Sequence, residues 1–391
     1  MRLKYIKDAW LILGITLLIL ILLEIGITLF CYRKGYLQSS SSDIKIDPRS
    51  QAEVYYNIPW VKDYFKELGE SFKTQWKSYV YWRREPFKGK YINIDDKGLR
   101  VTIGSNNIPS GFNSTYRIFM FGGSTLWGTG ARDAYTIPSL LSKYLAKKGM
   151  NTEIANYGEN GYVSTQEVIE LLLQLQKENI PNVVIFYDGV NDIFSAYQHS
   201  IAGLPQNENN RVKEFNLTNT RNLDKFVGIV FHEKVRELSI VRSANYIRSR
   251  FSSYLNEGIL KEKEKINYPA NLNEQVVKVY LNNMKIVNTL GKTYGFKTLF
   301  YWQPTIFTKT TLSNYEKGIV ADKKDINKLF DATYSKIADQ HFENARNGFH
   351  NISRMFESYE KPLYIDFCHI SEYGNQMVAE KIADDVIAIL D

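Results

Sequence analysis

The chain has few cysteines. Its 391 residues include two, Cys31 at the edge of an apolar N-terminal segment and Cys368 near the C-terminus. We expect no disulfide between them, and their spacing differs from that of cysteine metal sites. The cysteines therefore do not indicate a compartment, and we expect no metal.

The sequence also lacks a large excess of charge of one sign. Its 49 lysine and arginine residues and 42 acidic residues give a net charge of +7, which is modest for this length. Lysine and glutamate alternate over residues 261–265, which is typical of a solvated helical face and not of a phosphate-binding stripe. We therefore expect no nucleic-acid partner. With 44% hydrophobic residues and no internal repeat, the composition is that of a folded protein.

A long apolar run lies near the N-terminus. Residues 9–32 are almost continuously apolar, long enough as a helix to cross a hydrocarbon core of roughly 30 Å. The bulky Leu29, Phe30 and Tyr32 stand where a cleaved signal peptide or a lipoprotein signal needs small residues. We therefore expect a retained transmembrane anchor at 9–32. Glu24 is the one carboxylate inside it, and its cost is offset by the surrounding leucines and isoleucines.

The charges that flank this run give a weak orientation signal. Arg2, Lys4 and Lys7 precede it, whereas Arg33 and Lys34 follow it. The positive-inside rule then favours a cytoplasmic tail at residues 1–8 and an extracytoplasmic location for the rest of the chain.

Residues 33–115 form an N-terminal segment that changes character along its length. It begins as a polar linker with four consecutive serines at 39–42 and then becomes dense in tyrosine and tryptophan. We expect these aromatic residues to pack on the main domain, with a carbohydrate platform as the alternative. Residues 91–94 and 99–102 flank Asp95, Asp96, Lys97 and Gly98, which predicts a β-hairpin with the glycine in the turn.

From Tyr116 onward, strand and helix patterns alternate, which predicts a mainly parallel sheet with helices on its faces. The five expected strands are Arg117–Phe121, Glu153–Tyr157, Val183–Tyr187, Lys297–Tyr301 and Pro362–Ile365. Ser164 and Glu167 predict a capping box at the start of one helix, and another helix should run from Asn271 to Gly295. Residues 194–270 are too long for an ordinary connection and are interpreted as an insertion, a lid or a partner surface.

Chemically useful residues follow four of these strands. Ser124 follows two glycines, Gly161 and Asn191 follow the second and third strands, and Asp366 and His369 follow the fifth. A hydrolytic serine needs a base, an acid that orients the base, and hydrogen-bond donors for the oxyanion. In this reading His369 is the base, Asp366 orients it, and the oxyanion hole consists of the Ser124 and Gly161 N–H groups and the Asn191 amide. Leu126 stands where the nucleophile elbow of α/β-hydrolases has glycine, so that fold is a poor match.

These segments resemble the signature blocks of the SGNH, or GDSL-type, hydrolase superfamily, in the same chain order. Ser124, Gly161, Asn191 and the closing Asp366 and His369 stand at the matching positions, and the resemblance covers about residues 116–390 outside the insertion. It implies a three-layer α/β/α, flavodoxin-like hydrolase domain at 116–391. The first block reads Gly-Gly-Ser-Thr instead of Gly-Asp-Ser-Leu, a variant associated with membrane-anchored bacterial members.

Other candidate residues receive weaker readings. Gln303 opens toward the same sheet edge and is a possible substrate contact, although the loop geometry set by Pro304 explains it equally well. Cys368 is interpreted as a small buried filler whose side chain faces away from His369. The remaining histidines, His199, His232, His341 and His350, lack the Asp-x-x-His spacing and are expected to be structural.

The expected activity is that of a membrane-anchored serine esterase. The resemblance and the anchor favour an O-acyl ester on an envelope glycan as substrate, with acetyl as the acyl group. An O-acyltransferase with a sugar hydroxyl as acceptor uses the same triad, and a non-enzymatic membrane-tethered assembly protein is the third hypothesis. A lipid esterase would need an apolar insertion, and this one is largely polar. No cofactor is implied, and the sequence does not identify a protein partner.

Overall fold

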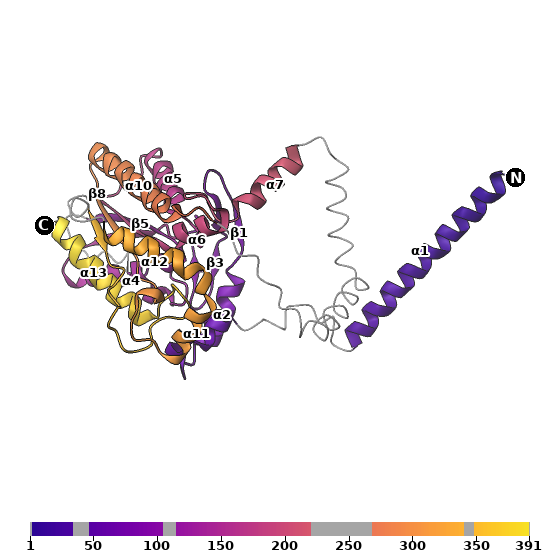
Figure 1. Ribbon diagram of the computed structural model, residues 1–391, viewed down its shortest axis with the longest axis horizontal. Helices are drawn as coiled ribbons and strands as arrows, with labels where there is room; N and C mark the ends of the chain where they lie inside the picture. Colours follow the sequence, from indigo (N-terminus) through magenta and orange to yellow (C-terminus); the bar gives the residue numbers. More distant parts are fainter. Residues whose placement is uncertain (1, 34–46, 105–114, 220–267, 340–347, 391) are drawn as a thin grey trace. The chain divides into compact units, whose positions relative to one another are not determined.

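The computed structural model describes residues 2–33, 47–104, 115–219, 268–339 and 348–390 (Figure 1). The chain divides into two compact units, one made of residues 46–208 and 266–391 and the other of residues 1–45 and 209–265. The start of the predicted linker and residues 220–267 of the predicted insertion lie outside the described residues. The larger unit contains every residue of the expected active site.

The smaller unit contains helix α1 (Arg2–Arg33) and most of α7 (Glu208–Asn219). Within α1, Lys7–Leu29 has a mean hydropathy of 2.7 and is the one helix among the described residues that is long and apolar enough to cross a membrane. This confirms an apolar N-terminal helix of membrane-spanning length. A signal sequence has the same length and composition.

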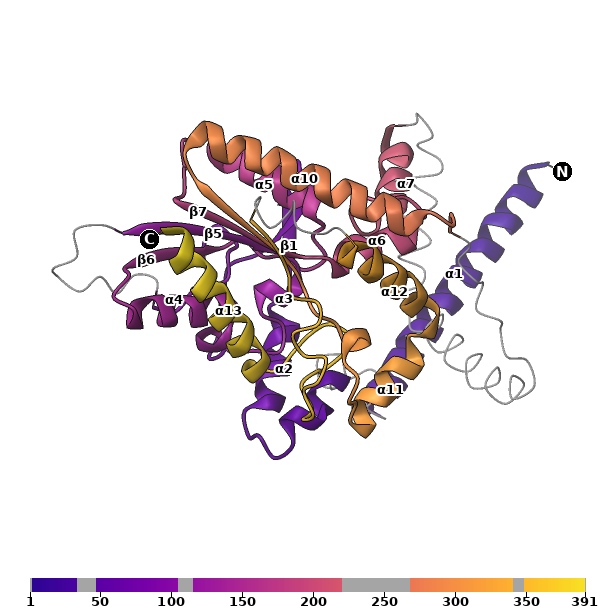
Figure 2. The ribbon, with the colours of Figure 1, turned by 60° about the vertical axis from the view of Figure 1, so that its left-hand side comes forward.

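The larger unit is built on a parallel sheet of five strands. The strands are β5 (Tyr116–Gly122), β6 (Thr152–Asn156), β7 (Val183–Asp188), β8 (Lys297–Trp302) and β9 (Phe349–Asn351). They lie in the order β6-β5-β7-β8-β9, and each neighbouring pair is parallel (Figure 2). The first four strands are those expected from the sequence.

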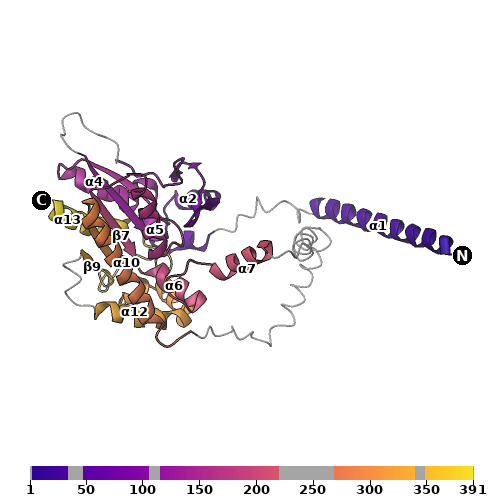
Figure 3. The same ribbon diagram turned by 90° about the horizontal axis from the view of Figure 1, so that it is seen from above.

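Helices cover both faces of this sheet. One layer contains α5 (Ser164–Leu175), α6 (Val190–His199), α10 (Leu272–Tyr294) and α12 (Lys324–Ala338). The other contains α4 (Ile137–Lys147) and α13 (Glu372–Leu390), which lie side by side (Figures 2 and 3). Strand β5 shows the two-residue alternation that a sheet between two layers requires. Phe119 and Phe121 enter the first core, and Ile118 and Met120 enter the second. The three-layer α/β/α architecture is therefore confirmed.

The fifth strand predicted from the sequence, at residues 362–365, is wrong. Residues 362–365 form only an isolated bridge, between Tyr364 and Ile370, and the fifth strand is β9. The backbone N–H groups of Leu363 and Tyr364 donate instead to the carboxylate of Glu316, at 3.0 and 3.2 Å. Glu316 belongs to α11 (Asn314–Asp322) and is fully buried. The Glu316 side chain therefore accepts the hydrogen bonds that a neighbouring strand would have accepted. No local sequence pattern predicts this contact.

Residues 47–104 belong to the larger unit and pack against the rest of it, as the aromatic density predicted. Their elements are the short helices η1 (Pro48–Gln51) and η2 (Glu53–Tyr55), helix α2 (Val61–Glu70), and the strands β1 (Thr74–Lys77), β2 (Tyr81–Arg84), β3 (Phe87–Lys88) and β4 (Asn93–Ile94). They share a core with Trp127 of α3 (Ser124–Trp127). The guanidinium groups of Arg84 and Arg100 lie 4.6 and 4.4 Å from the Trp127 ring. The segment and the sheet are thus one folded body.

Residues 91–102 form the hairpin that the sequence predicts. Gly98 in the turn has φ +79°, and Asp95 N donates to Leu99 O and Val101 N to Asn93 O, both at 2.9 Å. Ile94 and Arg100 form the antiparallel bridge between the two arms, and Ile94 also belongs to β4, which pairs with β3. The buried Arg100 side chain donates to the carboxylate of Asp133 at 2.9 Å.

The predicted capping box of α5 is also wrong. The Ser164 hydroxyl donates to Asp192 Oδ1 at 2.6 Å, and Asn283 Nδ2 donates to Ser164 Oγ at 2.9 Å. The Glu167 carboxyl group is fully buried, and its neighbour is the carboxyl group of Asp188. Tertiary contacts have thus taken both residues away from the local role that their spacing suggests.

Glu167 of α5, Asp188 at the end of β7 and Asp192 of α6 form a cluster of three buried carboxyl groups. Burial raises the pKa of Glu167 well above its ordinary value, and the neighbouring Asp188 raises it further. Burial raises the pKa of Asp188 as well, and that of Asp192 to about 6. Folding therefore favours the protonated forms, so these groups oppose folding as the pH rises above about 4.3, the ordinary glutamate value.

Replacing Glu167 with the uncharged isostere tests this cost. We expect Glu167→Gln to raise the free energy of unfolding by about 1–3 kcal/mol at pH 8 and to change it little at pH 4. Urea unfolding of the full chain in nonionic detergent at both pH values measures the difference. Glu170→Gln is the matched control: it removes the partner of the buried Arg83, 3.4 Å away, and should destabilise the protein at pH 8. Equal effects of the two substitutions would contradict the interpretation.

The shared core around Trp127 makes a second prediction. Trp127→Ala should lower the free energy of unfolding by about 3–5 kcal/mol, because it leaves a cavity beneath two buried guanidinium groups. Trp76→Ala, at a side chain that is 68% exposed, should change it by less than about 0.5 kcal/mol. Denaturant titration followed by circular dichroism compares them. A loss below about 1 kcal/mol for Trp127→Ala would mean that residues 47–104 only rest on the surface.

Candidate active site

Ser124 lies at the carboxyl end of β5, at the first position of α3. Two glycines bring it there. A Cβ at Gly122 would lie 2.7 Å from Tyr187 O, and one at Gly123 would collide with Asn191 Nδ2. Only glycine allows the strand to turn this close to β7 and to the start of α6.

The structure brings Ser124, His369 and Asp366 into one hydrogen-bonded series. The Ser124 Oγ to His369 Nε2 distance is 2.7 Å, and the His369 Nδ1 to Asp366 Oδ2 distance is 2.6 Å. Because a carboxylate accepts, Nδ1 carries the proton, and Nε2 is left to accept from the serine hydroxyl. Ser124 and His369 are 245 positions apart in the sequence. The arrangement can remove a proton from the serine.

The carboxylate of this series is held tightly. Asp366 Oδ1 accepts the backbone N–H groups of Cys368 and His369 at 3.0 and 2.8 Å, while Oδ2 accepts the imidazole. Burial alone would raise the pKa of Asp366, but the His369 imidazole and then Arg49 hold it well below its usual range. Asp366 is therefore ionised at neutral pH, which suits a group that orients an imidazole.

Cys368 is buried, as expected, but it does not face away from His369. Its Sγ lies 3.5 Å from His369 Nδ1, because the two amides bound by Asp366 curl the chain out of the extended form. Burial raises the pKa of the thiol well above its ordinary value, and Asp366 raises it further. The thiol is therefore protonated and a weak nucleophile.

Asp366, Cys368 and His369 form a group whose ligand atoms are close enough to share a metal ion. It is the one group of three or more acidic, histidine and cysteine side chains of this kind in the described ranges. The fit is poor. Asp366 and His369 are already hydrogen-bonded to each other, and the neutral thiol of Cys368 is a weak ligand. The donor set suits acid–base chemistry better than coordination.

Gly161 and Asn191 lie at the neighbouring strand ends. Gly161 has φ +77°, which favours glycine, and Asn191 Nδ2 donates to Tyr162 O at 2.8 Å. The collision of a Gly123 Cβ with this nitrogen places Asn191 beside the serine loop. A polar side chain, Gln206, stands over both residues: its Nε2 lies 3.4 Å from Asn191 Oδ1, and its Oε1 would lie 2.8 Å from a Cβ at Gly161. Gln206 was not predicted, because it falls inside the segment read as an insertion.

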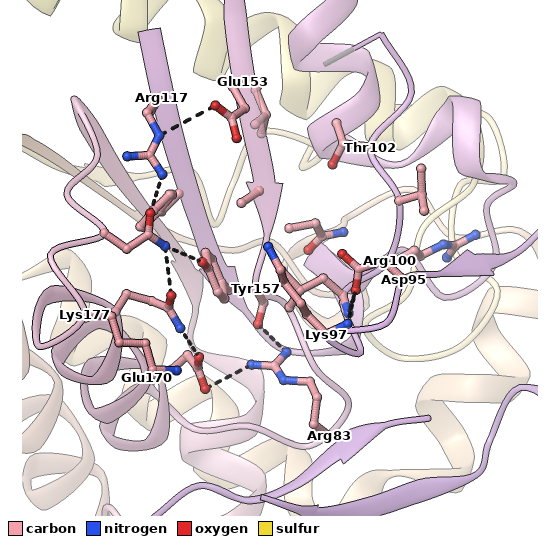
Figure 4. Close-up of a pocket in the computed structure, with 18 of the residues that line it drawn as sticks. Arg83, Asp95, Lys97, Arg100, Thr102, Arg117, Glu153, Tyr157, Glu170 and Lys177 are labelled. Carbon is pink, nitrogen blue, oxygen red and sulfur yellow. Dashed lines mark hydrogen bonds and ion pairs between the residues drawn. The ribbon is translucent and has the colours of Figure 1, made fainter. Parts of the chain in front are cut away.

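Residues 81–84 hold the loop that carries Gly161, a role that their composition did not reveal. Arg83 Nη1 donates to Tyr157 O at 3.0 Å, as Figure 4 shows. The backbone N–H of Arg84 donates to Glu159 at 3.0 Å, and Trp82 Nε1 donates to Asn160 O at 3.0 Å. Three consecutive residues of β2 thus bind the loop between β6 and α5. Their aromatic and basic character predicted packing only.

Arg83 also lines a cavity of about 600 Å³. Charged side chains from the N-terminal segment, β5, β6, α5 and the turn after α5 line it, and Figure 4 shows Lys97, Arg117 and Lys177 among them. Neither Ser124 nor His369 is among the lining residues. The cavity is therefore separate from the serine site.

The other residues considered in the sequence, Gln303 and the remaining histidines, contact protein groups where the structure describes them. Gln303 is buried, and its Oε1 accepts the hydroxyl of Thr125 at 2.7 Å, so this oxygen supports the residue after Ser124. His199 Nε2 accepts the Glu208 N–H at 3.4 Å, and His350 stacks on Tyr301. His232 and His341 lie outside the described residues.

Comparison with known proteins places the chain in a family. It matches the GDSL-like lipase/acylhydrolase family over residues 118–382, more than half of its length. No curated protein matches it. Among solved structures it is similar to the acetyl xylan esterase AlAXEase, with 18% identity, 69% of this chain and 99% of that chain covered, and a TM-score of 0.35.

Two further structures are similar at 12% identity. For the psychrotrophic esterase EstA from Pseudoalteromonas sp., 70% of this chain and 98% of that chain are covered, with a TM-score of 0.32. For a catalytic mutant of the acetylxylan esterase Axe2 from Geobacillus stearothermophilus, the shares are 71% and 95% and the TM-score is 0.36. On the family match and its parallel five-stranded sheet, the chain belongs to the GDSL-like lipase/acylhydrolase family, the SGNH-fold serine hydrolases that act on ester bonds.

Proposed function

We propose that the chain hydrolyses O-acyl esters with Ser124 as nucleophile, His369 as general base and acid, and Asp366 as the group that orients His369. The observation that carries the proposal is the unbroken hydrogen-bonded series from Ser124 Oγ through the imidazole to the Asp366 carboxylate. Ser124 Oγ attacks the ester carbonyl while His369 Nε2 takes its proton and passes it to the departing alcohol. Water then attacks the acyl-enzyme by the reverse proton path and releases the carboxylic acid.

The oxyanion hole in this proposal consists of the Ser124 and Gly161 N–H groups and the Asn191 side-chain amide. Support comes from the position of Asn191 Nδ2 against Gly123 and from the absence of a side chain at Gly161. Donors fixed before the reaction stabilise the developing charge without reorganisation. Hydrogen bonds from residues 82–84 hold the loop that carries the Gly161 N–H group.

We further propose that the acyl group is short, with acetyl as the natural case, and that it is carried by a glycan of the cell envelope. Gln206 stands over Gly161, and Trp82 Cζ2 would lie 3.5 Å from a Cβ there, so a polar and an aromatic side chain limit the space on the oxyanion side. The envelope location follows from α1 as a membrane anchor, with Arg2, Lys4 and Lys7 on the cytoplasmic side.

Substitution of the proposed catalytic residues tests the mechanism. With p-nitrophenyl acetate and the full chain in nonionic detergent, Ser124→Ala and His369→Ala should each lower kcat/KM by roughly 10³-fold or more. Asn191→Ala should lower kcat by about 10²- to 10³-fold, because one oxyanion donor is lost. His350→Ala is the matched histidine control and should retain activity. Hydrolysis that persists in Ser124→Ala would contradict the serine mechanism.

The same assay, with an O-acetylated oligosaccharide as substrate and a soluble sugar as acceptor, separates hydrolysis from transfer. Free acetate is the expected product, and acyl-sugar formation without free acetate would establish the O-acyltransferase instead. Product analysis by mass spectrometry distinguishes the two.

Gln206→Ala tests the short-acyl proposal. Removing this side chain should raise kcat/KM for the butyrate ester relative to the acetate ester by roughly tenfold, because it opens space beside Gly161. Chain-length profiles with p-nitrophenyl esters measure the ratio. Gln376→Ala, on the surface of α13, is the control and should leave the ratio unchanged. A wild-type preference for long acyl chains would contradict the proposal.

A further inference from the structure

Arg49 lies beside the hydrogen-bonded pair of His369 and Asp366, called the dyad below, although Arg49 precedes the residues that match the family. It belongs to η1, well before residue 118 where the match begins. Its Nη1 lies 3.6 Å from Asp366 Oδ2, the oxygen that also accepts His369 Nδ1. A permanent cation thus stands next to the carboxylate of the dyad.

The position of this guanidinium is fixed by its own contacts. Arg49 Nε and Nη2 donate to the two oxygens of Asp47 at 3.0 and 2.7 Å, which leaves Nη1 directed at Asp366. Asp47 also caps η1 by accepting the Arg49 backbone N–H at 3.0 Å. The guanidinium carbon lies 5.8 Å from the centre of the Phe65 ring, and the side chain is 21% exposed. Arg49 is therefore built into the site and is not a mobile surface arginine.

The charge at this position has two physical consequences. It attracts the Asp366 carboxylate and so opposes its rotation away from the imidazole. It also disfavours a second positive charge on His369, because the carboxylate oxygen that would stabilise the imidazolium is already beside Arg49. Both effects act on the proton that His369 must accept from Ser124.

Other titratable groups also surround the dyad, and they do not cancel the effect of the Arg49 charge. They are Asp47, Tyr55, Tyr64, Tyr315, Lys323, Cys368 and Glu372, which is paired with Arg132 at 2.8 Å. Burial raises the pKa of the three tyrosines and of the thiol, so these are neutral near pH 7. The charged neighbours are then Arg49 and Lys323, with Asp47 partly offsetting Arg49 and Arg132 offsetting Glu372.

We propose that Arg49 is a positioning residue of the Ser124–His369–Asp366 site, which holds the Asp366 carboxylate and keeps His369 unprotonated to lower pH than the dyad alone would. The proposal rests on the serine esterase function proposed above. It assigns a role in the reaction to the segment that joins the anchor to the family domain.

The pH dependence of kcat/KM tests it. Without Arg49 the imidazolium is less repelled, so protonation begins at higher pH and the acid limb of the profile should move up by roughly 0.5–1 pH unit in Arg49→Met. Activity below the limb should fall about three- to tenfold relative to wild type, in line with that shift. The assay uses the full chain in nonionic detergent with p-nitrophenyl acetate. An acid limb at the wild-type position in folded Arg49→Met would overturn the proposal.

Two further variants separate charge from folding. Arg117→Met removes an arginine that pairs with Glu153 near the amino end of β5, away from the dyad, and should leave the limb in place. Asp47→Asn keeps an oxygen to cap η1 but removes the opposing charge, and should move the limb down. A limb that moves up in Arg117→Met as much as in Arg49→Met would overturn the proposal. If Arg49→Met does not fold, Arg49→Lys carries the test, with a smaller upward shift because lysine cannot bind both carboxylates at once.

A titration that needs no turnover distinguishes this inference from the function on which it rests. In Ser124→Ala protein labelled with ¹³C at its five histidines, NMR follows the ring of His369, assigned with a His369→Asn variant. Adding Arg49→Met should raise the pH midpoint of that titration by the same roughly 0.5–1 unit. An unchanged midpoint would overturn the role of Arg49 even if the wild type is an esterase, and a raised midpoint would support it even if no tested ester is hydrolysed.

Discussion

The buried ion pair between Lys309 and Glu316, with Nζ and Oε2 2.6 Å apart, determines the path of the chain that leads to Asp366. Glu316 accepts the N–H groups of Leu363 and Tyr364, and Lys309 Nζ donates to Lys361 O at 2.8 Å. Burial alone would raise the pKa of Glu316, but Lys309 and the amides lower it, so the carboxylate stays charged. Both carboxylate oxygens of Glu316 accept hydrogen bonds and Lys309 Nζ donates two, which is the satisfaction that a buried ion pair requires. The Asp366–His369 turn begins two residues later.

The site depends equally on residues that the family match does not include. Residues 82–84 bind the loop of Gly161, and Arg49 Nη1 lies 3.6 Å from Asp366 Oδ2. Ser124, His369 and Asp366 themselves lie at the carboxyl edge of the sheet, where parallel α/β folds place ligand sites. The N-terminal segment thus contacts both the loop of Gly161 and the Asp366 carboxylate.

The sequence could predict what depends on local pattern. Hydrophobic periodicity located four of the five strands and α10, which begins and ends where Asn271 and Gly295 predicted. Motif order located Ser124, Asp366 and His369, which the structure brings together. It failed where distant side chains override local preference. Glu316 replaces a strand partner at 363–364, and Asp192 takes the Ser164 hydroxyl that would have capped α5. Arg49 gave no signal, because its partner lies more than 300 positions away.

The long sequence separation between interacting parts has a consequence for synthesis. Residues 47–104 are synthesised before the groups that they contact: Arg83 donates to the carbonyl of Tyr157, 74 positions later, and Ser124 precedes His369 by 245 positions. Contacts of this kind must wait for the chain that contains them. A nascent chain that has not yet reached residue 369 therefore contains Ser124 without the imidazole that binds its hydroxyl. The hydrogen-bonded series closes only after that residue has been synthesised.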